Sequence, residues 1–481
     1  MSAPRSSPRV VMAVLAVATG SFAMLQSMLT PVLPTIQRDL HTDASSVTWV
    51  LTAWLLSAAV ATPLLGRVGD LAGKDRTLVF ALGAVAAGLL VGALAPNLPV
   101  LLGGRVVQGL GGAVFPLAFG ILRDELPAAR LASAVGVISA VIAGGGGLGM
   151  VLAGPIESAL GWRWLFWVPL AVVTATAVLA ARFVPASPAR TPGRVNGTAA
   201  ALLALWLVAL LVPLSSASSW GWAAPRTLGL FALAAVGLAA WIAVELRSAT
   251  PLIDMRMMRI PAVWTTNLVA LLFGAAMFGT YAFLPQFVQV PAATGYGFGE
   301  SVTVAGLLMV PLLVTMSVAG AVSGRVSPVL GFKPQLVAAS VVAAVGCAAL
   351  ALFHAAPWQL ALAGALLGVG FGLAYSAMTS LIVQAVPAGH TGAASGMNVN
   401  IRTIGGALGT AVVSSVVTSS AGPAGLPAES GFTTAFWALA GASVVAALLA
   451  LLVPTARRRT PRPEAELIVP TPAPAAVPAD V

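Results

Sequence analysis

Residues 66–76 read Gly66-Arg67-Val68-Gly69-Asp70-Leu71-Ala72-Gly73-Lys74-Asp75-Arg76. This charged stretch lies between two apolar runs, at 46–66 and 78–96. Each run approaches the roughly 20 apolar residues that a helix needs to cross about 30 Å of hydrocarbon. The stretch therefore predicts a short loop between two transmembrane helices.

Apolar runs of this kind continue outward in both directions, and we count about fourteen of them. They lie near 9–31, 46–66, 78–96, 98–122, 131–156, 164–184, 197–215, 227–246, 262–287, 301–322, 334–354, 358–385, 400–421 and 432–454. The whole chain is 59% hydrophobic and only 8% charged, whereas ordinary soluble domains carry about 25% charged residues. The sequence thus predicts an all-α integral membrane protein.

The basic residues orient these helices. Twenty of the 24 Lys and Arg residues fall in connecting segments on the same side of the membrane as the N-terminus. Arg402 is counted among these twenty, as a residue just before its helix. Three fall on the other side (Arg38, Arg163 and Arg226), and Arg105 lies within a span. Because basic residues collect on the cytoplasmic side, we expect both termini to be cytoplasmic. Abundant arginine and alanine point to a bacterial source, hence to the inner membrane. We also expect no nucleic-acid binding, since the basic residues form no patch.

An internal repeat supports a two-lobed plan. Gly324-Arg325-Val326 and Gly331 repeat the loop glycines at an offset of 258 residues, and Gly405-Gly406-x-Leu408-Gly409 repeats Gly145-Gly146-x-Leu148-Gly149 at 260. Parallel repeats of this kind are one plan of membrane transporters. We predict a six-helix lobe at 1–186, two inserted helices at 187–260, a second six-helix lobe at 261–454 and a disordered cytoplasmic tail at 455–481.

The loop at 66–76 resembles the G-x-L-x-D-r-x-G-r-k signature of the major facilitator superfamily. Within that superfamily, the sequence resembles the fourteen-span drug:proton antiporters. The resemblance implies a major facilitator fold and a gate-closing role for Gly66, Asp70, Gly73, Lys74 and Arg76. Asp70 is expected to pair with a helix N-terminus or a cationic neighbour, and Lys74 and Arg76 to face lipid headgroups. The second copy has Pro328 at the aspartate position, so only the first copy is expected to act as a latch.

Two further strings resemble the same family. Arg105-x-x-Gln108-Gly109 resembles R-x-x-q-G, whose arginine the family assigns to proton transfer, although an arginine satisfied by backbone carbonyls is the alternative. The run 144–149 and then Gly154-Pro155 resemble the glycine- and proline-rich antiporter helix, in which Gly145 and Gly149 would allow close packing. Generic tight packing is the alternative for this helix.

The predicted spans contain no carboxylate near their middles, and the first span lacks the aspartate that the family commonly has there. Proton coupling would then depend on carboxylates near the ends of spans, such as Asp70 and Glu157. The candidate pathway residues are neutral and suit an apolar, neutral or mildly anionic ligand. They are Gln26, Ser27, Thr30, Trp54, Asn267, Met277, Tyr281, Tyr375 and Asn398.

Taken together, the residues and the resemblance predict a monomeric secondary transporter that exports small hydrophobic molecules such as drugs or antibiotics, by proton antiport with alternating access in the lipid bilayer. The alternatives are an importer or facilitator of a small metabolite, and a non-transporting membrane sensor or scaffold. We predict no enzyme, cofactor or metal site, because the three histidines lie in loops. We also predict that ATP does not drive transport directly, because no G-x-x-x-x-G-K-[ST] loop is present.

Overall fold

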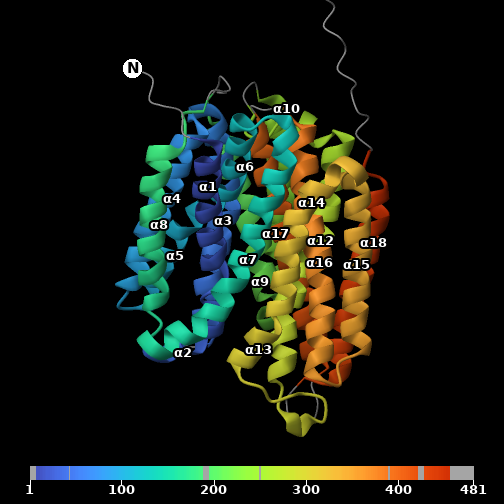
Figure 1. Ribbon diagram of the computed structural model, residues 1–481. Helices are drawn as coiled ribbons and strands as arrows, with labels where there is room; N and C mark the ends of the chain where they lie inside the picture. Colours follow the sequence, from blue (N-terminus) through green and yellow to red (C-terminus); the bar gives the residue numbers. More distant parts are fainter. Residues whose placement is uncertain are drawn as a thin grey trace, which may run out of the picture.

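A computed structural model describes residues 7–42, 44–187, 194–248, 251–387, 390–420 and 427–454. The chain forms a bundle of long helices that run roughly along one axis (Figure 1). Within the described residues, fourteen helices are long and apolar enough to cross a bilayer. The protein is therefore a multi-pass membrane protein, and the predicted all-helical fold class is confirmed.

The first group of spans forms one side of the bundle. Its helices are α1 (Pro8–Ser27), α3 (Ala44–Ala72), α4 (Lys74–Ala93), α5 (Leu98–Gly109), α6 (Val114–Glu125), α7 (Ala128–Leu160) and α8 (Trp164–Phe183). The short η2 (Leu110–Ala113) joins α5 to α6 within a single span, while η1 (Thr30–Val32) and α2 (Leu33–Asp39) follow α1. We call the end of the bundle that carries Asp70 the Asp70 end, and the end that carries α2 the opposite end.

The second group repeats this order on the other side. Its helices are α12 (Pro261–Gln289), α13 (Val302–Leu308), α14 (Val310–Leu330), α15 (Phe332–Leu352), α16 (Pro357–Ala385), α17 (Thr391–Ser419) and α18 (Glu429–Leu451), with η3 (Ala292–Thr294) after α12. The two groups are the two parallel six-helix lobes of the predicted fold.

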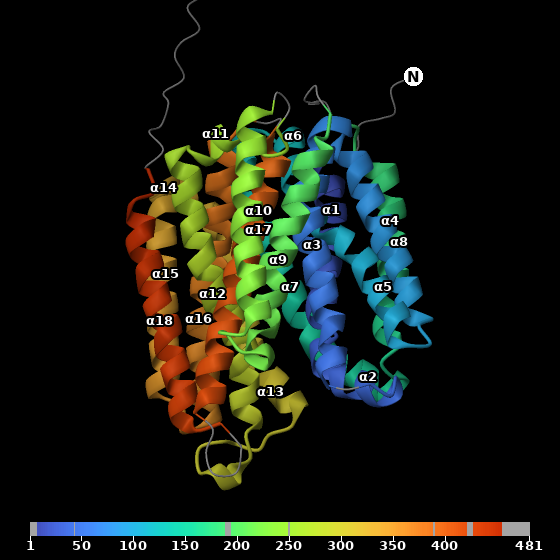
Figure 2. The same cartoon turned by 180° about the vertical axis from the view of Figure 1, so that it is seen from behind.

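Two inserted helices pack against each other, and one of them packs against both lobes. They are α9 (Gly197–Trp220) and α10 (Pro225–Arg247), followed by the short α11 (Met255–Met258). Trp206 of α9 and Trp241 of α10 hold the pair together with ring centroids 5.9 Å apart, and α9 lies on α3 and α17 (Figure 2). The domain boundaries stay predictions, and the tail at 455–481 lies outside the described residues.

The lobes meet along two seams that the repeat relates to each other. In one seam α3 packs on α17, and in the other α14, the repeat of α3, packs on α7, the repeat of α17. A Cβ on Gly66 would lie 2.8 Å from the Gly392 carbonyl oxygen, and one on Gly324 would overlap the Ala132 carbonyl. Each copy of the repeated glycine thus allows the backbones to approach closely across a seam.

One predicted span began too late. The run at 400–421 corresponds to α17, which begins at Thr391, so counting Arg402 in the segment before the helix was wrong. The first turns of α17 are rich in small and polar residues, and α17 has the lowest mean hydropathy of the fourteen spans, 1.3. Arg402 therefore lies inside the bundle.

Candidate functional site

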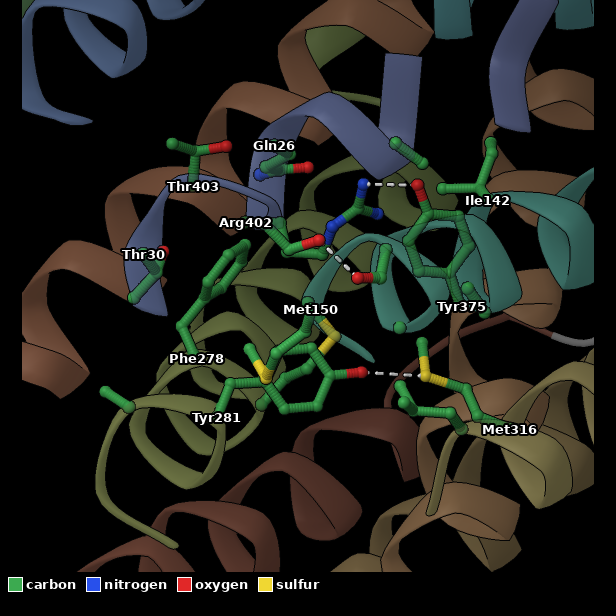
Figure 3. Close-up of a pocket in the computed structure, with 18 of the residues that line it drawn as sticks. Gln26, Thr30, Ile142, Met150, Phe278, Tyr281, Met316, Tyr375, Arg402 and Thr403 are labelled. Atoms are coloured by element: carbon green, nitrogen blue, oxygen red, sulfur yellow. Dashed lines mark hydrogen bonds between the residues drawn. The ribbon is translucent and has the colours of Figure 1, made fainter. Parts of the chain in front are cut away.

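A cavity of about 320 Å³ lies between the two lobes. Its lining contains six of the nine predicted pathway residues, which are Gln26, Ser27, Thr30, Met277, Tyr281 and Tyr375. Figure 3 shows four of them around this space, Gln26 and Thr30 from the first lobe and Tyr281 and Tyr375 from the second. Sequence reasoning missed other lining residues, among them Met150, Phe278, Met316 and Arg402. The cavity lining thus combines sulfur and aromatic groups with a few hydroxyl and amide groups.

The three other predicted pathway residues lie outside this lining. Trp54 packs with its ring 5.7 Å from that of Phe22 and beneath the guanidinium of Arg105. Asn398 donates from Nδ2 to Asn267 Oδ1 at 2.8 Å, which joins α17 to α12 within the second lobe. Asn267 and Asn398 therefore satisfy each other in the packed interior, whereas Trp54 Nε1 is buried without a hydrogen-bond partner among the described residues.

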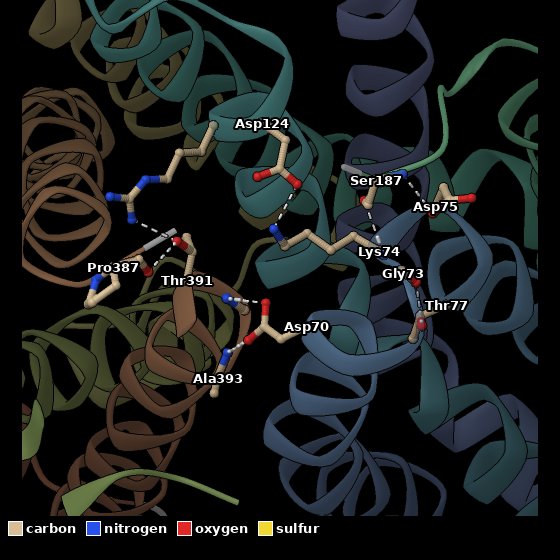
Figure 4. Close-up of polar contacts among 12 residues, drawn as sticks. Asp70, Gly73, Lys74, Asp75, Thr77, Asp124, Ser187, Pro387, Thr391 and Ala393 are labelled. Carbon is tan, nitrogen blue, oxygen red and sulfur yellow. Dashed lines mark hydrogen bonds and ion pairs between the residues drawn. The ribbon is translucent and has the colours of Figure 1, made fainter. Parts of the chain in front are cut away.

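Asp70 joins the two lobes at its end of the bundle. Its carboxylate accepts hydrogen bonds from the backbone N–H groups of Gly392 at 3.4 Å and Ala393 at 3.1 Å (Figure 4). Both belong to the first turn of α17, where N–H groups lack partners within the helix and the helix dipole favours a negative charge. Beside them Arg123 donates from Nη1 to Thr391 Oγ1 at 2.7 Å. The helix N-terminus is thus the hydrogen-bond partner of Asp70, and the cationic neighbours Lys74 and Arg67 lie close enough to interact with it electrostatically.

Lys74 does not face lipid headgroups, and that expectation was wrong. Its side chain is fully buried, and its Nζ pairs with Asp124 Oδ2 at 2.7 Å. Gly69 and Gly120 line the path of its aliphatic stem, because a Cβ on either would contact the Lys74 side chain. Gly73, with φ +114°, provides the turn into α4. Lys74 thus fastens α4 to α6 within the first lobe.

Arg67 is a further buried charge that the sequence did not single out. It is 3% exposed, and its Nε and Nη1 have no hydrogen-bond partner within the described residues. It lies close enough to Asp70 and Glu245 to interact with both electrostatically. Burial and the charge of Arg67 lower the pKa of His390, the residue before α17, and Asp254 opposes part of this effect.

Arg105 connects α5 to α3 rather than facing the cavity. Its Nε donates to the Val50 carbonyl oxygen at 2.9 Å and its Nη1 donates to Gln108 Oε1 at 2.7 Å. Gln108 in turn donates to the Gly88 carbonyl oxygen at 2.9 Å, and a Cβ on the neighbouring Gly109 would overlap Ser57 of α3. Backbone and amide acceptors therefore hold this guanidinium, whose role in proton transfer stays a prediction.

Arg105→Ala is expected to abolish transport while the protein still inserts into the membrane. The change removes the bond to α3 and leaves the Gln108 carbonyl without its donor in a buried site, where such losses cost about 1–3 kcal/mol each. Arg163→Ala is the control, because Arg163 also lies over a tryptophan ring, that of Trp162, but is exposed at the start of α8. The measurement is the rate of substrate export by membrane vesicles that contain equal amounts of each transporter variant. Wild-type export by Arg105→Ala would show that this network is dispensable.

The glycine-rich helix α7 packs closely on two sides. Gly145 and Gly149 face α1 of their own lobe, because a Cβ there would meet the Gly20 and Met24 carbonyls. Gly144 and Gly147 instead face Ser317 and Leu313 of α14 across the seam. Near the opposite end, the Cβ position of Gly154 lies 3.7 Å from Thr303 Oγ1, and Pro155 continues the helix. Close packing across the seam is therefore made by glycines other than the two predicted ones.

Gly149→Ala should lower the stability of the protein by about 1–3 kcal/mol, because a methyl group forced into a packed interface displaces the backbone. The added Cβ would overlap the Met24 carbonyl. Gly83→Ala is the matched control, since a Cβ on this α4 glycine meets no described atom within 4 Å. Thermal unfolding of the two purified variants checks the difference. An unchanged melting temperature for Gly149→Ala would contradict the packing argument.

Comparison with known proteins agrees with this architecture. Residues 15–410 match the Major Facilitator Superfamily. The chain is 33% identical to the cephamycin export protein CmcT of Amycolatopsis lactamdurans over 90% of both chains. It is 28% identical over 397 residues to the multidrug transporter protein MdtP of Bacillus subtilis, which covers 81% of this chain and 72% of that protein. The crystal structure of the human organic anion transporter MFSD10 shares the fold, with a TM-score of 0.67 at 17% identity, over 93% of this chain and 100% of that chain.

Two parallel lobes, a cavity between them and a polar contact that closes one end define a membrane transporter. The chain belongs to the Major Facilitator Superfamily. The resemblance found in the sequence is thereby confirmed, as is the prediction that the protein is a transporter and not an enzyme.

Proposed function

We propose that the protein exports small hydrophobic organic molecules, such as drugs or antibiotics, across the inner membrane of a bacterium. The observation that carries the proposal is the central cavity of about 320 Å³, whose sulfur and aromatic lining suits ligands of varied shape. Two relatives are named for multidrug transport and for cephamycin export. Rocking of the two lobes about this cavity gives alternating access.

Both termini are proposed to be cytoplasmic, so that the Asp70 end faces the cytoplasm. The distribution of basic residues supports this orientation, and Arg76, Arg247 and Lys333 lie at the Asp70 end in the described part of the chain. In this orientation the Asp70 contacts close the cavity to the cytoplasm. The cavity is formed within one chain, which supports a monomeric transporter in the bilayer.

Protons are the proposed coupling ion, and their binding group is expected near the end of a span. Among the described lining residues of the cavity there is no carboxylate. Asp70 lies in the contact between lobes, and Glu157 near the opposite end accepts a hydrogen bond from Thr35 Oγ1 at 3.0 Å. Rocking of the lobes would change the access of water to Asp70, and Glu157 is partly exposed near the opposite end.

Purified protein in liposomes, loaded with a hydrophobic dye, tests this proposal under an imposed pH gradient, an imposed potential or neither. We expect the pH gradient to accelerate dye efflux, and the acceleration to be lost when Asp70→Asn and Glu157→Gln are combined. Acceleration that survives both changes would place the proton site elsewhere. Dye efflux at a rate that responds to neither the pH gradient nor the potential would indicate a facilitator. A protein that moves no dye under any of the three conditions would fit a sensor or scaffold.

A further inference from the structure

Arg402 introduces a positive charge into the middle of the bundle. It lies eleven residues after the start of α17 at Thr391, which is about 16 Å along the helix axis. The helix continues to Ser419. The guanidinium of Arg402 is therefore too far from either end of α17 to extend into the headgroup region. Arg402 is 4% exposed and lines the central cavity.

Tyr375 of α16 holds this guanidinium from one side only. Arg402 Nη2 donates to the Tyr375 hydroxyl at 2.9 Å, and its Cζ lies 4.0 Å from the centroid of the same ring (Figure 3). The other terminal nitrogen, Nη1, has no hydrogen-bond partner within the described residues. One donor group of a buried cation is thus left free beside the cavity.

The cavity provides no negative charge to balance it. Arg402 is the sole charged residue among its described lining residues. An ionised arginine inside a membrane normally pairs with an acidic group or with backbone carbonyls, because its desolvation costs several kcal/mol. Here the tyrosine supplies a neutral oxygen and a ring face, which offset only part of that cost.

We propose that the central cavity binds amphipathic organic anions, with the carboxylate or sulfonate of the ligand on Arg402 and its apolar body against Met277, Phe278 and Tyr281. A guanidinium presents parallel N–H donors that match a carboxylate, and such charge-assisted bonds are about twice as strong as neutral ones. The three apolar partners line the same cavity as Arg402. This inference rests on the proposed function, because it names the substrate class of the same cavity.

Two ligands of nearly equal shape test the inference: 9-anthracenecarboxylate, which is an anion at pH 7.5, and the neutral 9-anthracenecarboxamide. Binding is measured by equilibrium dialysis against the full-length protein in phosphatidylcholine nanodiscs, with empty nanodiscs subtracted. We expect the wild type to bind the carboxylate at least about tenfold more tightly than the carboxamide. Arg402→Gln should remove this preference and leave carboxamide binding within about twofold, while Arg402→Lys should keep part of it.

Carboxamide binding by Arg402→Gln also shows that the variant is folded. If Arg402→Gln does not fold, the inference is tested by the ratio of carboxylate to carboxamide affinity in the wild type and in Arg402→Lys. A wild type without preference, or an Arg402→Gln protein that keeps it, overturns the inference. Displacement of the carboxylate by added phosphatidylglycerol at equal concentration would assign Arg402 to an anionic lipid and overturn it as well.

Efflux of the two ligands from proteoliposomes separates this inference from the proposed export. If the carboxamide is exported and the carboxylate is neither bound nor exported, export stands and the anion site fails. If the carboxylate is bound in preference but neither ligand is exported, the anion site stands and the export function fails.

Discussion

We expect Asp70→Asn to lower the export rate at least about tenfold. The carboxylate is fully buried and accepts the N–H groups of Gly392 and Ala393 at the start of α17. A hydrogen bond to a charged group contributes about 1.5–3 kcal/mol, which corresponds to a roughly tenfold to hundredfold change in the population of the closed state. An amide keeps the shape of the side chain but loses the charge that the helix dipole favours.

The measurement is the initial rate of dye export by everted vesicles, normalised to the amount of transporter. Asp75→Asn is the matched control: Asp75 accepts a hydrogen bond from the Ser187 backbone at 3.1 Å, at the same end of the bundle but without joining the two lobes (Figure 4). If Asp70→Asn and Asp75→Asn export equally fast, the contact between the lobes does not limit the cycle.

The second large effect concerns the ion pair between Lys74 and Asp124. Both partners are almost completely buried, with 0% and 4% of their side chains exposed. Removing one partner leaves a buried charge without compensation, so Lys74→Met and Asp124→Leu should each destabilise the protein by about 3–5 kcal/mol. The double variant should recover most of that loss, because well-packed apolar residues replace a buried ion pair with little cost.

The free energy of unfolding is measured in a mixed-detergent series for the wild type, the two single variants and the double variant. The double-mutant cycle over these four proteins isolates the interaction between the two residues. Arg76→Met is the control, since Arg76 lies in the same first turn of α4 but is exposed. Additive losses in the double variant would mean that the two charges do not stabilise each other.

The sequence predicted the spans and the repeat because both depend on local composition. A run of apolar residues identifies a helix without knowledge of its neighbours, and the repeated glycines Gly66 and Gly324 proved to face equivalent seams. The contact of Asp70 with a helix N-terminus was also among the expectations, since the spacing of glycine and aspartate in its loop resembles the family signature; its role as a latch stays a prediction.

The errors have a common physical cause. The surroundings of a charged residue are set by packing between distant helices, which composition does not report. Lys74 sits in a charged loop by sequence, yet Asp124, fifty positions later, buries it. Arg402 follows ten residues of low hydropathy and was read as lying outside the membrane. Which faces of α3, α12 and α17 turn inward was equally hidden, so Trp54, Asn267 and Asn398 were placed in the pathway.

The two inserted helices have a consequence for molecules dissolved in the lipid. Because α9 lies on both α3 and α17, it covers the α3/α17 seam from the bilayer side, where Leu203, Leu207 and Trp206 pack around Ala59, Met397 and Ile404. Neither inserted helix packs on the α7/α14 seam in this way; the short α13, which begins the same span as α14, contacts both α7 and α14 near the opposite end. The two seams, which the repeat relates, therefore differ in how far they are exposed to lipid. A hydrophobic molecule that entered the cavity from the bilayer would have to pass between α7 and α14. A twelve-helix protein without the insertion would offer two lateral routes where this one offers one.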